Sequence, residues 1–187
     1  MQFIDYDDFE RLASADPLYY AGRWEYMGKV IEFLKNRPEN FASALELGPY
    51  LFSIAKEAVT MGIAPEADPD MKYYACKHPV YDIVRNADTV PWPAEDKSFD
   101  IFIGLQVLEH TSDKKSIFAE IERVAHYAAI TLPYKWQRKD PGNCHTGIDE
   151  DVIRGWSGRE PVYSRVIANV TGRNSRIFLF YDFGSKL

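Results

Sequence analysis

Two histidines, His110 and His145, are the residues of this sequence best suited to proton transfer. A free imidazole has a pKa of about 6.5, so its neutral form can remove a proton from a hydroxyl or an amine near neutral pH. We predict His110 as a general base and His145 as a second acid or base, or as a substrate contact. The structural alternatives are a local hydrogen bond for His110 and a loop position before a helix cap for His145.

A second candidate site is the segment ALELGPY, residues 44–50, which matches the first half of the pattern of a nucleotide-cofactor loop. Glu46 closes an apolar run, and Gly48 follows two residues later, where glycine lets the backbone approach a ligand. Pro49 and Tyr50 stand where such loops usually carry more glycines, which argues against a nicotinamide oxidoreductase. The remaining alternative is the plain end of a buried strand, with Gly48 ending the strand and Glu46 capping the next helix.

The apolar pattern predicts the elements that must hold these residues in place. Apolar residues at helical spacing predict an amphipathic helix over 19–34, and nearly continuous apolar runs predict buried strands over 99–106 and 127–134. A capping cluster predicts the start of a helix over 111–126. The other predicted elements are a strand over 41–48, helices over 53–59 and 149–156, and strands within 60–70, 80–88, 161–170 and 175–183, the last two joined by the turn TGRN.

Strands and helices alternate along most of the chain, and the last two strands form a hairpin. This order predicts an α/β fold with a doubly wound, mostly parallel sheet and a C-terminal antiparallel hairpin. Ligands of such sheets bind at the carboxyl ends of the strands, where Glu46 and Gly48 lie. We expect a single domain over residues 1–187, with an N-terminal helical segment over 1–40 and an α/β core over 41–187.

The composition limits the classes of partner. The chain has 187 residues, of which 46% are hydrophobic, enough for a sizeable core. Its net charge of -6 offers no positive field for nucleic acid, so we expect no nucleic-acid partner. Neither Cys76 nor Cys144 belongs to a Cys-x-x-Cys pair, so we expect no disulfide framework and no structural zinc site. The acidic start and the lack of a long apolar run predict a cytoplasmic protein without a membrane span.

Four short segments occur in an order that resembles a known family. They are LELG after the first predicted strand, NADTVPW after the third, FDIFIGLQVLEH at the fourth and ITLPY at the fifth. In this order and spacing the chain resembles the class I S-adenosylmethionine-dependent methyltransferases, in particular their small type-11-like branch. The resemblance covers about residues 42–134, and the terminal hairpin is similar to the last two strands of that family.

The resemblance implies S-adenosyl-L-methionine as the cofactor and assigns the cofactor's methionine end to the loop after the first strand. Glu46 and Gly48 match the first motif of the family, in which glycine admits the backbone and the acidic residue orders the loop. Pro49 and Tyr50 replace positions that relatives leave to glycine. We expect both to stiffen and wall the loop, with Tyr50 beside the methionine end of the cofactor.

Two further pairs are implied as cofactor-binding residues. Leu105 and Gln106 fall where the family holds the sulfonium and carboxypropyl region. Asn86 and Ala87 match the Asp-Ala pair that reads adenine, and the Asn86 amide keeps an oxygen acceptor without the charge; its structural alternative is a turn residue that bonds its own backbone. The acidic residue that usually binds both ribose hydroxyls has no single counterpart within residues 61–68.

The segment around His110 also resembles a metal-dependent variant of the family. Ubiquinone-pathway O-methyltransferases and small-RNA 2′-O-methyltransferases place Glu-x-x-Glu-His there as ligands for a divalent ion. This chain has Gln106, Glu109 and His110 at the matching positions, so the first carboxylate is an amide. Because losing that charge weakens a site for a hard cation, we expect no metal at this site.

The sequence therefore predicts a methyltransferase acting on an oxygen or nitrogen atom of a small-molecule or glycan-like acceptor. Its rival is a methyltransferase-like domain that has lost catalysis and serves as a binding or scaffold module. The missing glycines and the unplaced ribose carboxylate favour that rival. A homo-oligomer is compatible with the sequence, which identifies neither the acceptor nor the oligomeric state.

Overall fold

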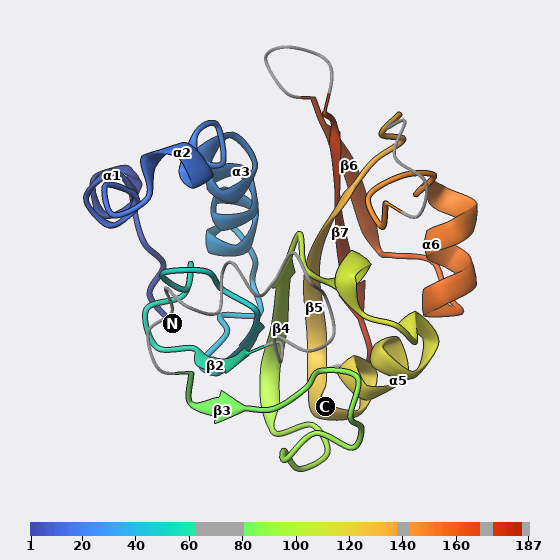
Figure 1. The fold of residues 1–187 in the computed structure, drawn as a ribbon. Helices are drawn as coiled ribbons and strands as arrows, with labels where there is room; N and C mark the ends of the chain where they lie inside the picture. The colour runs from blue at the N-terminus through green and yellow to red at the C-terminus, as the bar shows by residue number, and fades with distance from the viewer. Residues whose placement is uncertain (63–80, 138–142, 169–173, 185–187) are drawn as a thin grey trace.

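The computed structural model describes residues 1–62, 81–137, 143–168 and 174–184, and its centre is a seven-stranded sheet (Figure 1). The strand order is β3-β2-β1-β4-β5-β7-β6, with β7 antiparallel to both neighbours and the other pairs parallel. The strands are β1 (Ala44–Leu47), β2 (Val59–Gly62), β3 (Ile83–Val84), β4 (Phe99–Leu105), β5 (Ala125–Pro133), β6 (Tyr163–Ile167) and β7 (Arg176–Asp182). This topology confirms the predicted α/β fold with a C-terminal antiparallel hairpin.

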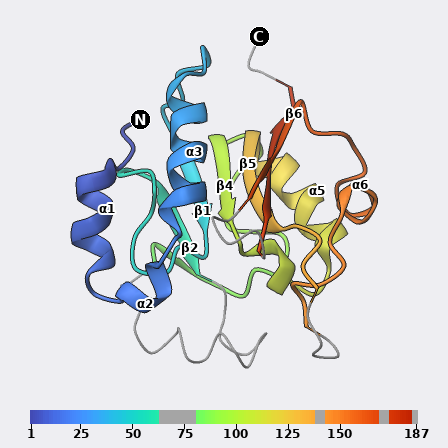
Figure 2. The same cartoon turned by 90° about the horizontal axis from the view of Figure 1, so that it is seen from above.

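Helices cover both faces of the sheet (Figures 1 and 2). Successive strand side chains point to opposite faces, so Ile101 and Ile103 of β4 pack in one core while Phe102 packs in the other. The first core is shared with the N-terminal helices, and the second with α5 and α6. The helices are α1 (Tyr6–Ala13), α2 (Pro17–Tyr20), α3 (Trp24–Lys35), the short 3-10 helix η1 (Leu108–His110), α5 (Lys114–Val124) and α6 (Glu150–Ser157).

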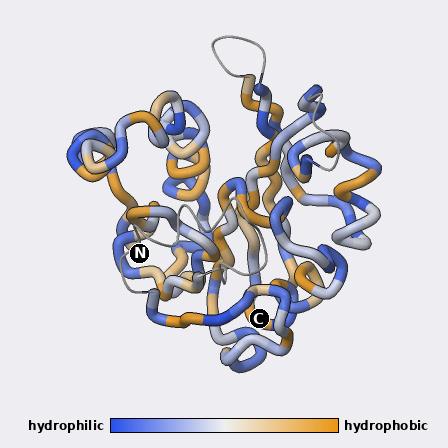
Figure 3. Tube along the Cα trace, in the orientation of Figure 1, coloured by the Kyte–Doolittle hydropathy of each residue, from blue (hydrophilic) through white to orange (hydrophobic). Residues whose placement is uncertain are grey.

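Hydrophobic residues recur along the strands in the hydropathy colouring of Figure 3. The nine residues of β5 are all buried, which agrees with the nearly continuous apolar run that predicted this strand. On α3 the buried residues include Met27, Ile31 and Leu34, at the spacing expected of an amphipathic helix. No helix in the described part of the chain has both the length and the apolar character needed to cross a membrane.

The helix predicted over 19–34 is two helices. Gly22 has a φ of +70°, a left-handed conformation that ends the short helix α2 before α3 begins at Trp24. Asp16 caps α2 by accepting a hydrogen bond from the Tyr19 amide at 3.2 Å. The break turns the chain sharply and brings Tyr19 and Tyr20 to the carboxyl end of β1, where both line a cavity.

The helix predicted over 53–59 is absent, so that prediction is wrong. The Ile54 carbonyl accepts a hydrogen bond from the Ile4 amide at 3.0 Å, and the Lys56 amide donates to the Gln2 carbonyl at 2.9 Å. These backbone groups therefore pair with the N-terminal segment, which removes them from any helical hydrogen-bond pattern. The connection between β1 and β2 is an irregular segment without a helix.

Most of the remaining predicted elements occur with shorter bounds, although β5 begins two residues and β2 one residue before the predicted start. The helix over 111–126 starts at Lys114, because Asp113 caps it through the Ser116 amide, and it ends at Val124 where β5 begins. The helix over 149–156 is α6, capped by Asp149. Strand β3 is only two residues long, and the turn residues 171–173 lie outside the described residues.

Candidate functional site

The candidate site lies where the strand order reverses. From β1 the chain continues to β2 on one side, whereas β4 lies on the other side of β1 and leads on to β5. Such a reversal leaves a crevice at the carboxyl ends of the two central strands. Glu46, Gly48 and Leu105 line a cavity of about 30 Å³ at this point, together with Pro49 and Tyr50. The structure thus brings together five of the predicted cofactor-binding residues.

Glu46 is a buried carboxylate, 3% exposed, near the end of β1. Its Oε2 atom accepts a hydrogen bond from the Ile54 amide at 3.1 Å and another from the Ser53 hydroxyl. Burial raises the pKa of the Glu46 carboxyl to about 7, although these hydrogen bonds favour the charged form. Glu46 therefore orders the irregular segment that follows the loop, and it does not cap a following helix.

Gly48 has a φ of +62°, the left-handed region that favours glycine. Its amide donates to the Met61 carbonyl at 2.7 Å, so the turn begins directly after the last bond between β1 and β2. The next carbonyl, that of Pro49, accepts a hydrogen bond from the Tyr81 hydroxyl at 2.9 Å. The loop after β1 is therefore tied to the segment that precedes β3.

Tyr50 belongs to a group of aromatic rings that contact one another. Its ring lies 4.1 Å from that of Tyr19 and 6.0 Å from that of Tyr20, between centroids. Its hydroxyl donates to Asp16 at 3.0 Å, and Tyr50 is buried. The N-terminal helices thus cover the loop after β1, and the cavity left beneath them has room for about one water molecule.

Gln106 directly follows β4 with a φ of +56°, which is uncommon for a residue other than glycine. Its backbone amide donates to the Thr131 carbonyl at 2.9 Å. Its side-chain Nε2 atom is buried and has no hydrogen-bond partner among the residues that the structure describes. A buried donor without a partner costs about 1–3 kcal/mol, so a bond from this amide to a ligand would recover free energy.

Asn86 and Ala87 do not line this cavity. The Asn86 side-chain oxygen accepts from the Asp88 amide at 3.0 Å, and its carbonyl accepts from the Thr89 amide at 2.9 Å. The Ala87 carbonyl accepts from the Trp92 indole at 2.9 Å. Both residues therefore stabilise their own turn, and the Asn86 oxygen keeps one lone pair for a further bond.

The ribose end of the predicted cofactor site is partly covered. Gly62 ends β2, and a Cβ atom at this position would come within 2.4 Å of the Tyr81 ring. Glycine is therefore required there because Tyr81 packs on it. The alternative register within 66–68 lies outside the described residues.

His110 and His145 are 35 positions apart in sequence but form a pair in space, with ring centroids 4.9 Å apart. Cys144 lies between them, with its Sγ atom 3.5 Å from Nδ1 of each ring. Burial alone would raise the pKa of the Cys144 thiol, but the two imidazoles lower it to about 7. Sequence analysis identified both histidines and missed Cys144, although it directly precedes His145.

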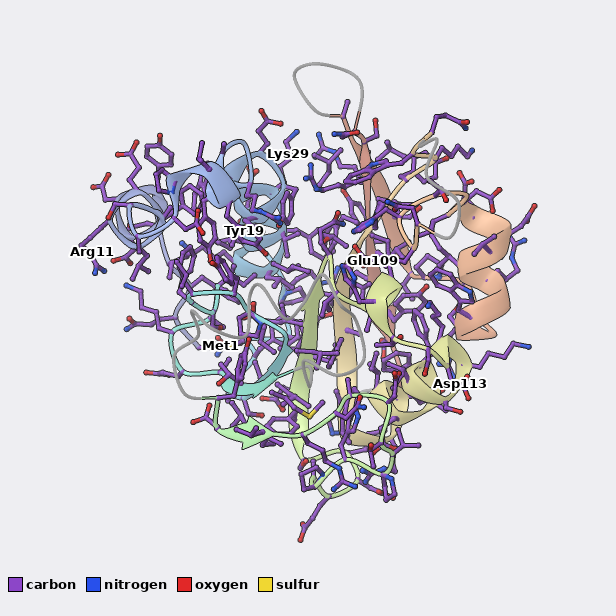
Figure 4. All side chains as sticks on the ribbon, in the orientation of Figure 1. Met1, Arg11, Tyr19, Lys29, Glu109 and Asp113 are labelled. Atoms are coloured by element: carbon purple, nitrogen blue, oxygen red, sulfur yellow. The ribbon has the colours of Figure 1, made fainter. Side chains whose placement is uncertain are left out.

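Glu109 is a second residue whose role sequence analysis missed. It is 1% exposed, and neither carboxylate oxygen has a hydrogen-bond partner among the described residues. Burial raises the pKa of Glu109, opposed by its electrostatic interactions with His110, His145 and Arg23. Figure 4 shows Glu109 beside the end of β4 and Tyr19 on the side of the N-terminal helices. The hydrophobic pattern of the sequence does not single out Glu109, because its neighbours Val107 and Leu108 are ordinary core residues.

Known structures share this fold. The N-methyltransferase NodS from Bradyrhizobium japonicum, in complex with S-adenosyl-L-homocysteine, is 14% identical, with a TM-score of 0.59 over 95% of this chain and 97% of its own. A S-adenosylmethionine-dependent methyltransferase from Aquifex aeolicus is 16% identical, with a TM-score of 0.53 over 95% and 98%. A chain of the Haloferax volcanii complex between a methyltransferase activator and a protein described as a methyltransferase is 14% identical, with a TM-score of 0.58 over 97% and 98%.

Sequence comparison supplies the family. A search of curated protein sequences found no match. The family described as "Methyltransferase domain" matches residues 29–129, which is more than half of the chain and includes the loops after β1 and β4. This match agrees with the strand order, with the shared fold and with the predicted resemblance to the type-11 branch. The chain therefore belongs to the methyltransferase domain family.

Proposed function

We propose that this protein transfers a methyl group to an oxygen or nitrogen atom of a small-molecule or glycan-like acceptor. S-adenosyl-L-methionine is the cofactor of this methyltransferase domain, and its sulfonium supplies an electrophilic methyl group. The proposal is supported above all by the buried Gln106 amide, which has no hydrogen-bond partner among the described residues and directly follows Leu105, a residue that lines the cavity. That position is where a doubly wound sheet binds its ligand.

The residues at the ends of β1 and β4 fit the methionine end of this cofactor. The left-handed Gly48 keeps the backbone free of a side chain, and Gln106 offers a donor for a carboxylate. Glu46 offers a carboxylate for the amino group on the same cavity. We assign Pro49, Tyr50 and Leu105 as the walls of this site, with Asn86 and Ala87 as the adenine contacts.

We place the acceptor at the other side of the β4 end, beside His110 and His145. Trp136 stacks on His145 with centroids 5.6 Å apart, and the Arg176 guanidinium lies 5.7 Å from the Trp136 ring. In this proposal His110 removes the acceptor's proton, and His145 serves as a second acid or base or as an acceptor contact. Much of the catalysis then comes from positioning the nucleophile in line with the methyl group.

Calorimetric titration with S-adenosylmethionine and S-adenosylhomocysteine tests the proposed cofactor site. We expect Gln106→Leu to weaken binding by about tenfold or more, because a hydrogen bond to a charged group contributes about 1.5–3 kcal/mol. Gln2→Leu, an exposed glutamine at the N-terminus, is the matched control and should bind normally. The proposal is wrong if neither compound binds at millimolar concentration.

One observation favours the alternative of a methyltransferase-like module without catalysis. The cavity of about 30 Å³ is too small for the methionine end of the cofactor unless the covering Tyr19 and Tyr50 rings move. Tyr50→Ala separates the two functions. If Tyr50 walls a working site, the variant should bind S-adenosylhomocysteine less tightly. Tighter binding would instead show that the ring blocks the site and would favour the inactive module.

We also propose that residues 1–187 form one domain and that the protein is cytoplasmic. The N-terminal helices share one hydrophobic core with β1, β4 and β7, which supports the first proposal. Limited proteolysis tests it, because a separate N-terminal segment would be released near residue 40. Fractionation of cells that produce the protein tests the second.

A further inference from the structure

We propose that His110, Cys144 and His145 form a binding site for a zinc ion. This inference is independent of cofactor binding, because it rests on side chains outside the cavity at the end of β1. One potential ligand atom from each of the three residues lies within 4.8 Å of the other two. All three side chains are half-buried, so an ion can reach them from solvent.

The two sulfur–nitrogen distances match the corresponding edges of a tetrahedral zinc site. Zn–S and Zn–N bonds of about 2.3 and 2.0 Å at a tetrahedral angle place sulfur and nitrogen about 3.5 Å apart. Both Nδ1 atoms lie 3.5 Å from the Cys144 sulfur. An ion placed between the three atoms would therefore find the Cys144 sulfur already at a suitable distance from both nitrogens.

Local structure holds the two neighbouring ligands in place. The Thr146 amide and hydroxyl both donate to the Asn143 carbonyl, at 3.2 and 2.9 Å, and close a turn around Cys144 and His145. Trp136 stacks on the His145 ring, and the Trp136 indole donates to the Ser175 carbonyl at 2.5 Å. The loop is thus attached to the sheet through Trp136, while His110 comes from η1 directly after β4.

The donor set selects a zinc-like ion over a hard cation. Thiolate and imidazole ligands suit zinc, whereas magnesium and calcium prefer oxygen ligands. The site therefore differs from the carboxylate and histidine arrangement of the metal-dependent methyltransferases. Binding would release the Cys144 thiol proton to solvent and would displace the 2.8 Å hydrogen bond between His145 Nδ1 and the Asn143 side-chain oxygen.

Glu109 supplies a second observation that points to a cation here. This carboxylate is 1% exposed, has no hydrogen-bond partner among the described residues and interacts electrostatically with His110, His145 and Arg23. A buried negative charge without a partner is costly unless a positive charge lies nearby. A zinc ion, the Cys144 thiolate and the Glu109 carboxylate together have no net charge. The ion would thus add a positive charge close to this carboxylate, on which Arg23 and Arg176 already act.

Three protein ligands leave one position of a tetrahedral ion for water or for a heteroatom of the acceptor. With zinc bound through Nδ1, neither imidazole is free to act as a base through that atom. The ion would then lower the pKa of the heteroatom that it binds. The proposed role of His110 as the base therefore applies to the metal-free protein.

Cobalt titration of the metal-free, reduced protein tests the site. We expect about one equivalent of Co²⁺ to bind with a thiolate charge-transfer band and the intense visible bands of a tetrahedral ion, and Zn²⁺ to abolish both. Cys144→Ser should lose the charge-transfer band and bind Zn²⁺ more than about a hundredfold more weakly, since even outer-shell changes cost about 10–100-fold. Cys76→Ser, at the other cysteine, is the matched control and should keep the band.

Alkylation of the wild-type protein adds a readout that needs no variant. Zinc should protect Cys144 from iodoacetamide at least tenfold while Cys76 reacts at an unchanged rate. The inference is overturned if binding is not saturable near one equivalent, if the band survives in Cys144→Ser, or if zinc does not protect Cys144. Titration of the same metal-free protein with S-adenosylhomocysteine reports on the methyltransferase proposal separately.

Discussion

The loops after β1 and β4 leave the same edge of the sheet but differ in whether their buried polar groups have hydrogen-bond partners. After β1, the Glu46 carboxylate is hydrogen-bonded, and the tyrosines of the N-terminal helices cover the loop. After β4, the Gln106 amide and the Glu109 carboxylate are buried without a partner among the described residues. The first loop is therefore complete without a ligand, whereas the second keeps polar groups that a ligand would satisfy.

This difference suggests a separate role for each of the two loops. Polar groups that are already satisfied hold a loop in one shape, and unsatisfied ones raise the free energy of the empty state and favour binding. The loop after β1 would thus set the geometry of the cofactor site, while the loop after β4 supplies groups that respond to cofactor, acceptor or metal. Four substitutions test this division, in order of decreasing effect.

Glu46→Gln should increase the free energy of unfolding by about 3 kcal/mol at pH 8. Because burial raises the Glu46 pKa from 4.5 to about 7, the folded protein keeps a proton that the unfolded chain loses between these values. Stability of the wild type should therefore fall as the pH rises through this window. Urea unfolding from pH 4 to pH 8 measures the slope, which Glu46→Gln should reduce and the exposed Glu57→Gln should not. If the slope is unchanged in Glu46→Gln, Glu46 is not the cause of the pH dependence of stability.

Glu109→Leu should stabilise the metal-free protein by about 2 kcal/mol at pH 8, because it removes a buried carboxylate that has no described partner. Glu120→Leu is the matched contrast. Glu120 is also buried, but it accepts from the Trp92 amide at 2.5 Å and pairs with Arg123 at 2.6 Å, so its loss should destabilise. Opposite signs in urea unfolding would support the comparison, and destabilisation by both changes would contradict it.

Gly48→Val should destabilise the protein by about 1–2 kcal/mol, because a β-branched residue is strained at a φ of +62°. Gly158→Val, at a φ of +66° after α6, should cost a similar amount. Only the first variant should also lose affinity for S-adenosylhomocysteine in calorimetry. Equal affinities in the two variants would show that the loop after β1 does not bind the cofactor.

Tyr50→Phe should have the smallest effect, a loss of about 1 kcal/mol, because it removes the hydrogen bond to Asp16 and keeps the ring. The control is Tyr163→Phe, since the Tyr163 hydroxyl has no hydrogen bond in the part of the chain that is described; it should change stability little. Thermal unfolding measures both. A loss of equal size in the control would mean that the bond to Asp16 does not hold the tyrosine cover in place.

Much of the fold could be predicted from periodicity. The buried runs at β4 and β5 and the capped helices α5 and α6 were all identified, because apolar spacing and caps are local signals. The helix over 53–59 was predicted wrongly, because the segment has helical composition but bonds to residues 2–4 instead. Pairing with the distant N-terminus has no signal in the local sequence. Tertiary contacts therefore outweigh the helix propensity of residues 53–59.

The sequence by itself determined the family, the doubly wound sheet with its C-terminal hairpin, and which residues stand at the ends of β1 and β4. It did so because motif order and hydrophobic period are properties of the chain. Only the tertiary structure decided that Tyr19 packs on Tyr50 of the loop after β1, that Glu46 has hydrogen-bond partners while Glu109 has none among the described residues, and that Cys144 lies between two histidines. The physical reason is that burial and hydrogen bonding depend on which segments meet in space, and spacing along the chain does not specify those meetings.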